Sequence, residues 1–280
     1  PQVIGKSPEE LRVLLRAMRD LGYHRCDLNA GCPWPFVVKK DRGAGLLRRP
    51  DLLEGMLEAG CEGMPGGFSI KVRLGLDNQD LLLERMSLLN DYPLAGVTIH
   101  ARTARQMYRG EVDLDAFGQC LGACRHAVRY NGDIQSVDDL RYLRSRFPGV
   151  TGWMIGRGAL YDPLLPARIK GLDTGDPVSR LHRFAALVAE NAGQELSGPA
   201  SWLGRMKELW FYLHQAFAGG ETLWKRIRVC RRPDDYERAV ADWFAAGPQP
   251  APPRNGIAPR ERPEGSGENP GALPHTRKQP

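Results

Sequence analysis

Residues 25–33 read Arg-Cys-Asp-Leu-Asn-Ala-Gly-Cys-Pro, a strand-like segment that runs directly into a tight polar turn. The glycine lets the backbone turn closely, and Pro33 stiffens the exit, so the turn presents Cys32 at the end of the strand. A cysteine in a tight turn is most often simply buried. The strand-end position between Gly31 and Pro33 favours a catalytic role for Cys32, whereas Cys26, inside the strand, is expected in the core.

The same alternation of short strands and amphipathic helices continues along the chain, which predicts a parallel sheet. A doubly wound sheet and a closed barrel both fit this alternation. A doubly wound sheet concentrates its site at one crevice, whereas a barrel gathers the carboxyl ends of all strands around one mouth. Polar residues follow nearly every strand, so we predict an α/β fold of the (β/α)8 TIM-barrel type. Further strands are expected at 2–5, 68–74, 95–100, 127–130 and 152–155.

Cationic side chains lie near the ends of the strands expected at 68–74 and 95–100. Lys71 and Arg73 lie two apart, and therefore on one face of their strand. Parallel strands of a barrel are covered on the outside, so Lys71 is expected to face the mouth and to contact a ligand. His100 and Arg102 repeat the pattern on the next strand, although a single histidine is as often structural as functional.

Glycine-containing turns follow the last two strands. Asn131-Gly132-Asp133 either forms an ordinary turn or contacts a ligand. Gly156-Arg157-Gly158 follows the final strand, where barrels commonly hold a phosphate on loop amides and a helix N-terminus. Arg157 can add charge-assisted hydrogen bonds to such a phosphate.

The composition of the chain limits the class of protein and the partners that can be expected. The chain has 280 residues, of which 42% are hydrophobic and 26% charged, so it can bury a sizeable core. A net charge of +6 permits an anionic partner without requiring one. No apolar run approaches the roughly 20 residues of a membrane span, and no signal-peptide pattern is present at residues 1–10. We therefore expect a cytoplasmic monomer without membrane contact, with reduced cysteines and without a metal site.

The pattern changes after residue 170. Residues 171–246 are predicted to form an all-helical domain in which basic residues alternate with aromatic ones, as suits an RNA backbone and exposed bases. A solvated helix face beside a tryptophan core is the simpler alternative. Residues 247–280 are rich in proline and glycine, lack aromatic residues and are predicted to be disordered. The candidate RNA-binding cations are Lys225, Arg226, Arg228, Arg231 and Arg232.

Taken together, the strand-end motifs resemble those of the tRNA-dihydrouridine synthases, over residues 1 to about 243. Residues 204–213 and 227–229 are similar to the bacterial C-type subgroup, which acts on uridine 16 of the D-loop. The motifs that carry the resemblance are Asp-Leu-Asn-Ala-Gly-Cys-Pro at 27–33, Lys-Val-Arg-Leu-Gly at 71–75, His-Ala-Arg-Thr at 100–103, Asn-Gly-Asp-Ile at 131–134 and Met-Ile-Gly-Arg-Gly-Ala-Leu at 154–160.

The resemblance implies an FMN-binding barrel, residues 1–170, followed by a helical tRNA-recognition domain. NADPH would reduce the flavin, reduced FMN would give a hydride to C6 of the uracil, and Cys32 would protonate C5. Asn29 and Arg102 match positions close to the uracil. Flavin contacts are implied for Gln2, Lys71, His100, Asn131, Gly132, Asp133, Gly156 and Arg157.

The chain also departs from the family pattern. The family's barrel has two strands before the one that ends near Gln2, so we expect an N-terminally truncated barrel of six strands. This departure leaves open a truncated, non-catalytic tRNA-binding remnant. A small-molecule FMN oxidoreductase of the dihydroorotate dehydrogenase type is a further alternative. The basic, tryptophan-bearing helical block argues against it, because a pyrimidine-sized substrate needs no such surface.

Overall fold

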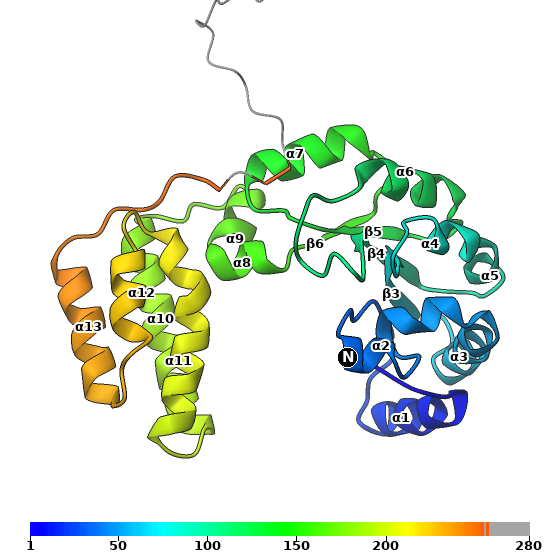
Figure 1. The fold of residues 1–280 in the computed structure, drawn as a ribbon, viewed down its shortest axis with the longest axis horizontal. Coiled ribbons are helices and arrows are strands. Elements are labelled where there is room, and N and C mark those ends of the chain that lie inside the picture. The colour runs from blue at the N-terminus through cyan, green and yellow to red at the C-terminus, as the bar shows by residue number, and fades with distance from the viewer. Residues whose placement is uncertain (255, 258–280) are drawn as a thin grey trace, which may run out of the picture.

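The strands follow one another in space as they do in the sequence. The computed structural model describes residues 1–254 and 256–257. Its strands are β1 (Gln2–Val3), β2 (Cys26–Ala30), β3 (Phe68–Gly75), β4 (Gly96–Thr103), β5 (Val128–Asn131) and β6 (Gly152–Met154). They pair in sequential order and every neighbouring pair is parallel (Figure 1). A doubly wound sheet would reverse its order part-way, so this is the order of a barrel. The predicted α/β fold is confirmed.

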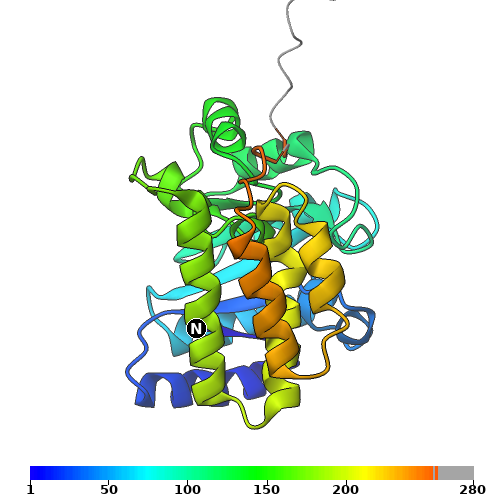
Figure 2. The ribbon, with the colours of Figure 1, turned by 90° about the vertical axis from the view of Figure 1, so that its left-hand side faces the viewer.

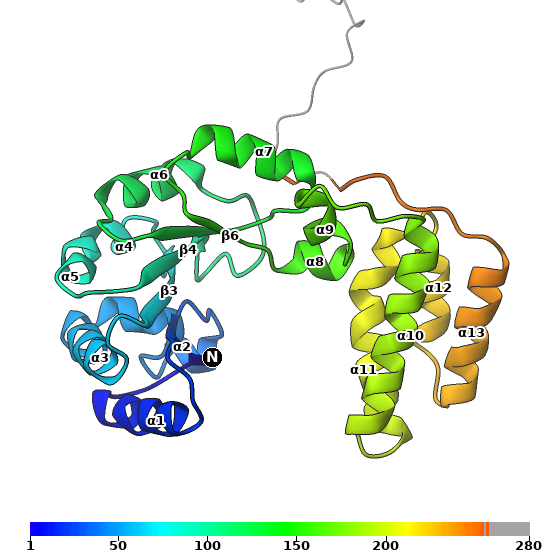
Figure 3. The ribbon, with the colours of Figure 1, turned by 180° about the vertical axis from the view of Figure 1, so that it is seen from behind.

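The connecting helices lie along the outer face of the sheet (Figures 1 and 3). Local signals fix where they begin: Ser7 accepts a hydrogen bond from the Glu10 amide at the start of α1, and Ser136 and Asp139 form a capping box at the start of α7. The helical segment between β3 and β4 is divided into two short helices at Arg85. These helices are α1 (Pro8–Asp20), α3 (Pro50–Gly63), α4 (Leu81–Glu84), α5 (Met86–Asn90), α6 (Leu114–Ala123) and α7 (Val137–Arg146).

Of four short helical segments, only the one that begins at Arg157 is expected from the sequence, because the others are too short to show a helical period. Two of them follow the Cys32 turn, and the other two follow β6 and lie between the sheet and the helical block (Figure 1). They are α2 (Pro35–Val38), the 3-10 helix η1 (Gly43–Arg48), α8 (Arg157–Tyr161) and α9 (Leu165–Ile169).

The apolar residues gather in two clusters. The larger one lies between the sheet and its helices, and Phe68, Ile70 and Val72 of β3 are all fully buried in it. The smaller one lies inside the helical block, where the buried Trp210 Nε1 donates to Tyr236 Oη at 2.9 Å. Figure 2 shows this block face-on. It consists of α10 (Pro177–Glu195), α11 (Pro199–Leu213), the 3-10 helix η2 (His214–Ala216), α12 (Glu221–Ile227) and α13 (Pro233–Ala245).

The chain beyond α13 differs in part from the expectation of disorder. The Ala218 amide donates to the Gln249 carbonyl at 2.9 Å, and the Ala251 amide donates to the Ala216 carbonyl at 2.8 Å. Long-range backbone pairing of this kind cannot be read from a proline-rich composition. The remainder of the predicted disordered tail, residues 258–280, lies outside the described residues. Within the described part of the chain, no helix combines the length and apolar character that a membrane crossing requires.

The contact of α3 with β3 gives a stability prediction. A Cβ on Gly60 would lie 2.0 Å from Phe68 Cε1, so Gly60→Ala should lower the free energy of unfolding by about 1–3 kcal/mol through overpacking. Gly122→Ala is the control, because it is also helical and a Cβ there meets no atom within 4 Å. It should leave the protein unchanged or up to about 1 kcal/mol more stable. Urea denaturation of both variants measures the difference, and equal effects would contradict the packing argument.

Candidate active site

The register of the sheet places the predicted strand-end residues in neighbouring rows. Asn29 pairs with Lys71 across β2 and β3, Arg73 pairs with His100 across β3 and β4, and His100 pairs with Asn131 across β4 and β5. In parallel strands all these residues approach the same edge of the sheet. The structure thus brings together side chains that are about 100 residues apart in the chain.

The Cys32 turn is shaped by Asn29. The side-chain oxygen of Asn29 accepts hydrogen bonds from the Gly31 amide at 3.1 Å and from the Cys32 amide at 2.9 Å. Its side-chain nitrogen donates to Gln2 Oε1 at 2.9 Å, and Gln2 donates to Asp27 at 2.7 Å. Asn29 and Gln2, predicted to contact substrate and cofactor, therefore also fix the turn that carries the thiol.

A second loop closes on Cys32 from the other side. The Ala44 amide donates to the Cys32 carbonyl at 3.0 Å. Gly43 has φ +54°, and a Cβ there would lie 2.7 Å from the Cys32 carbonyl oxygen and 2.8 Å from Cys32 Cβ. Only glycine allows this approach. Gly43 is not among the residues predicted for the site, although the Gly-Ala-Gly run at 43–45 is a visible signal of close backbone contact.

Asp133 joins three βα units. Its carboxylate forms ion pairs with Arg102 from β4 and with Arg157 from α8, the latter at 2.8 Å. Burial raises the pKa of Asp133, but the hydrogen bonds and charges of the two arginines outweigh burial and leave this pKa below its usual value. Asn131 Nδ2 donates to the Met154 carbonyl at 2.9 Å, which ties the ends of β5 and β6 together.

The glycines of these two turns differ in how closely they are packed. Gly132 is buried at φ +144°, and a Cβ there would lie 2.9 Å from Tyr130 Oη. Gly156 precedes α8 at an exposed position. Beside it, a Cβ on Gly158 would lie 2.0 Å from the Ile134 carbonyl oxygen. The two phosphate-side turns predicted from the sequence are therefore packed against each other.

Tyr108 reaches over this cluster from the loop after β4, and sequence reasoning missed it. Its ring lies 5.4 Å from the Arg73 guanidinium, 5.1 Å from that of Arg157 and 6.3 Å from the His100 ring. Arg73 is buried and donates to the Gly31 carbonyl at 3.0 Å and the Thr103 carbonyl at 2.8 Å. No local pattern marks Tyr108, because its partners are on other strands.

The cations at this edge change the protonation of their neighbours. Burial, followed by the charges of Arg73 and Lys71, lowers the pKa of His100 to about 2, so His100 is neutral at physiological pH. Burial and the charge of Arg73 lower the pKa of Lys71 to about 8. Lys71 therefore titrates closer to neutrality than an ordinary lysine.

The same cluster fits an anionic group. Arg102 is 1% exposed, yet its Nε and Nη1 atoms have no hydrogen-bond partner among the described residues. A buried guanidinium with free donors is costly unless a ligand supplies acceptors. Lys71, Arg73 and Arg157 add positive charge at the same edge, and phosphate is the group that arginine forks bind best.

The five predicted RNA-binding cations lie at a distance from this edge, on α12 and the turn that follows it. All five are exposed. Arg226 pairs with Asp242 and Arg232 with Asp234, each at 2.7 Å. Within the described residues, Lys225, Arg228 and Arg231 form no ion pair, which leaves their charges available to a partner.

Comparison with known proteins decides the family. The family model described as dihydrouridine synthase matches residues 1–211. The chain belongs to the dihydrouridine synthase family. The strand-end motifs thus predicted the right family and an enzyme of the right class.

Two relatives of this dihydrouridine synthase-family chain carry the same name, tRNA-dihydrouridine(16) synthase. The protein from Cupriavidus necator is 30% identical over 226 residues, which are 75% of this chain and 68% of the relative. The protein from Escherichia coli K12 is 29% identical over 244 residues, 85% of this chain and 76% of the relative. Among solved structures, morphinone reductase matches with a TM-score of 0.44 at 15% identity over 61% of this chain and 50% of its own, too distant to add to the fold.

The low pKa of Lys71 gives a prediction for the cofactor-free protein. The ordinary pKa of 10.5 applies to the unfolded chain and about 8 to the folded one, so the unfolded state binds more protons between these values. The stability of the wild type relative to Lys71→Met should rise with pH across this window, on the order of 2 kcal/mol. Urea denaturation at pH 7, 9 and 10.5 measures it. A difference that stays flat with pH would show that Lys71 is not desolvated.

Proposed function

We propose that this chain reduces a uridine in the D-loop of tRNA, at position 16, to 5,6-dihydrouridine. Membership of the dihydrouridine synthase family supports the reaction, and two relatives named tRNA-dihydrouridine(16) synthase support the position. The observation that carries the proposal is the edge at which the turn of Cys32 adjoins the row of Lys71, Arg73 and His100. We further propose residues 1–170 as the catalytic unit and 171–246 as the tRNA-recognition unit.

We propose FMN as the cofactor and NADPH as its reductant. Arg157 and the packed turns at 131–133 and 156–158 would hold the phosphate side, because a cation and two glycine-containing turns are found together there. Gln2, Lys71 and His100 would hold the ring side. When bound, the flavin supplies a hydride to C6 of the uracil.

The remaining proton comes from Cys32. Saturating the C5–C6 bond requires one hydride and one proton, so a proton donor must stand near C5 while the hydride reaches C6. His100 cannot serve as this donor, because burial and cationic neighbours lower its pKa to about 2 and the ring therefore carries no acidic proton at physiological pH. The Cys32 thiol gives its proton to C5 and the resulting thiolate recovers a proton from solvent.

Lys71 and His100 orient the uracil and the cofactor. Neutral His100 can donate from one ring nitrogen and accept at the other, which suits the alternating donors and acceptors of a heterocycle. Lys71 offers donors to a carbonyl oxygen, and its positive charge stabilises negative charge that develops on the ring. Asn29 and Arg102 complete the contacts that we propose for the uracil.

Reaching this edge requires the uridine to leave the stacked D-loop. Enzymes that act on a base extrude it into a pocket and gain the unstacking energy back from contacts elsewhere. The exposed cations of α12 and the following turn supply such contacts in the form of phosphate pairing.

The direct test of this function uses transfer RNA that lacks dihydrouridine. Wild-type protein with FMN and NADPH should add two hydrogens to one uridine, detected by mass spectrometry of the digested tRNA. Cys32→Ala should keep flavin binding and NADPH oxidation but lose product formation by roughly 10²–10⁴-fold, as expected for the loss of a general acid. Cys61→Ala is the matched control, because Cys61 is also a free, half-buried thiol but lies on α3. Wild-type product formation by the Cys32 variant would remove that thiol from the mechanism.

The role of the helical cations is tested by salt dependence. Replacing Arg228 and Arg231 by Ala should flatten the slope of log affinity against log salt by about one to two units and weaken all tRNAs alike. Arg141→Ala is the control, because Arg141 is an exposed arginine of α7 that pairs with Asp138. If the double variant binds with an unchanged slope, the RNA-binding surface lies elsewhere.

A further inference from the structure

A strap, defined as residues 249–254 and 256–257, returns from the end of α13 to the part of the chain that holds the sheet (Figures 1 and 2). We call this part, from β1 to α9, the barrel half. Its first part pairs with η2 and the residues after it, through the amides of Ala218 and Ala251. Its last part reaches α7, where the Ile257 amide donates to Asp139 Oδ1 at 2.6 Å. The strap therefore contacts both halves of the molecule.

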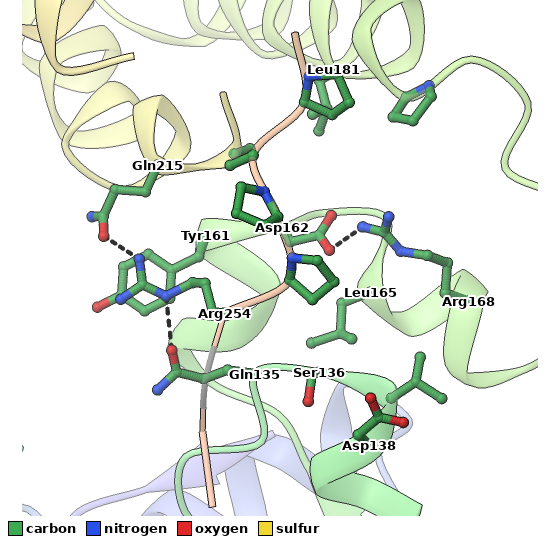
Figure 4. Close-up of a pocket in the computed structure, with 17 residues that line it drawn as sticks. Gln135, Ser136, Asp138, Tyr161, Asp162, Leu165, Arg168, Leu181, Gln215 and Arg254 are labelled. Carbon is green, nitrogen blue, oxygen red and sulfur yellow. Dashed lines mark hydrogen bonds and ion pairs between the residues drawn. The ribbon is translucent and has the colours of Figure 1, made fainter. Parts of the chain in front are cut away.

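Arg254 makes the contacts that join the two halves. Its Nε donates to Gln135 Oε1 on the β5–α7 loop at 2.8 Å, and its Nη1 donates to Gln215 Oε1 in η2. Its guanidinium also lies 4.0 Å from the ring of Tyr161 in α8. Figure 4 shows this side chain between the two glutamines. One half-buried guanidinium thus links the barrel half to the helical block.

Tyr161 extends this link. Its ring lies 5.6 Å from the ring of Tyr212 in α11, so it meets the helical block directly as well as through Arg254. A cavity of about 300 Å³ separates the halves beside it, lined by Leu165, Leu181 and the strap prolines (Figure 4). A junction that contains an open pocket has fewer packing contacts to fix its angle, which gives the polar contacts of Arg254 more weight.

Gly256 allows the strap to approach Asp139 at the start of α7, and we call this part of α7 the seat of the strap. A Cβ on Gly256 would lie 2.1 Å from Asp139 Oδ2, so no other residue fits here without displacing the strap. Asp139 is fully buried and caps α7 by accepting from the Ser136 amide at 2.9 Å. The seat is therefore a rigid part of the barrel half.

The seat also lies next to the edge of the sheet at which Lys71, His100 and Asn131 meet, which we call the catalytic edge. Gln135 is two residues beyond Asp133, the carboxylate that holds Arg102 and Arg157. We propose that Arg254 is a positioning residue, which sets the helical block relative to the catalytic edge and so places the target uridine. This inference rests on the proposed function, because it assigns the helical block to tRNA.

Steady-state kinetics with tRNA and NADPH test the proposal on the full chain. Arg254→Ala should raise KM for tRNA by about tenfold, as expected for losing a charged hydrogen-bond pair and a cation–π contact. The kcat at saturating tRNA and the tRNA-independent oxidation of NADPH should stay within about twofold of wild type. Arg254→Lys should be intermediate, because lysine keeps the charge but cannot fork to both glutamines.

Two further variants separate positioning from a general loss of structure. Gly256→Ala keeps the Arg254 side chain but should raise the same KM, because the added methyl group displaces the strap from Asp139. Gln215→Ala should raise KM for tRNA as well. Its effect should not add to that of Arg254→Ala, because both substitutions remove the same hydrogen bond between Arg254 and Gln215. Arg141→Ala is the matched control and should leave KM unchanged. Equal falls of kcat and of NADPH oxidation, or an unchanged KM in Arg254→Ala, would overturn the proposal.

A failure of the proposed function gives a different result. If the wild type forms no dihydrouridine in any tRNA, the proposed reaction is wrong, and the positioning role is then decided by equilibrium binding of the same tRNA. Binding about tenfold weaker in Arg254→Ala than in Arg141→Ala supports the strap as a positioning element. Equal binding of the two variants overturns it.

Discussion

The carboxylate of Asp133, held between Arg102 and Arg157, is the interaction on which the catalytic edge depends. A guanidinium as buried as that of Arg102 is strongly destabilising without a carboxylate partner. Asp133 supplies it from the end of β5, and the same carboxylate binds the arginine that begins α8. Three successive βα units are thereby fixed to one another at their carboxyl ends. Arg102 still has unpaired donors among the described residues, so this edge is also able to bind an anion.

The accumulation of cations explains why the edge divides its chemical roles as it does. Lys71, Arg73, Arg102 and Arg157 all act on His100, and together with burial they keep it neutral. A ring that cannot be protonated serves as a hydrogen-bonding group and not as an acid. The backbone of Cys32 is held by Asn29 on one side and by Gly43 and Ala44 on the other, and Arg73 ties the same turn to the row through the Gly31 carbonyl. The proton donor and the orienting groups are therefore fixed by one connected set of contacts.

Much of the fold and part of the candidate site could be predicted from the sequence, because their signals are local. The alternation of Ile70 and Val72 with Lys71 and Arg73 marks β3, and Ser7 followed by Pro8 marks the start of α1. The strand-end residues could be grouped because parallel strands end at one edge. Tyr108 and the docking of the strap could not be predicted, because each depends on a partner distant in the sequence. Ile257, for example, binds a carboxylate 118 positions earlier.

The strap shows how a segment of unpromising composition can become ordered. Proline restricts the unfolded chain, so residues 250–253 lose less entropy on docking than an ordinary segment would. Glycine at 256 permits the approach to Asp139 that any side chain would block. The same two residue types that predict disorder therefore reduce the cost of docking and make it fit. The docked strap contacts both halves of the molecule, so it acts on how the helical block presents tRNA and not on the chemical step at Cys32. Contacts far from Cys32 can in this way decide which uridine reaches it.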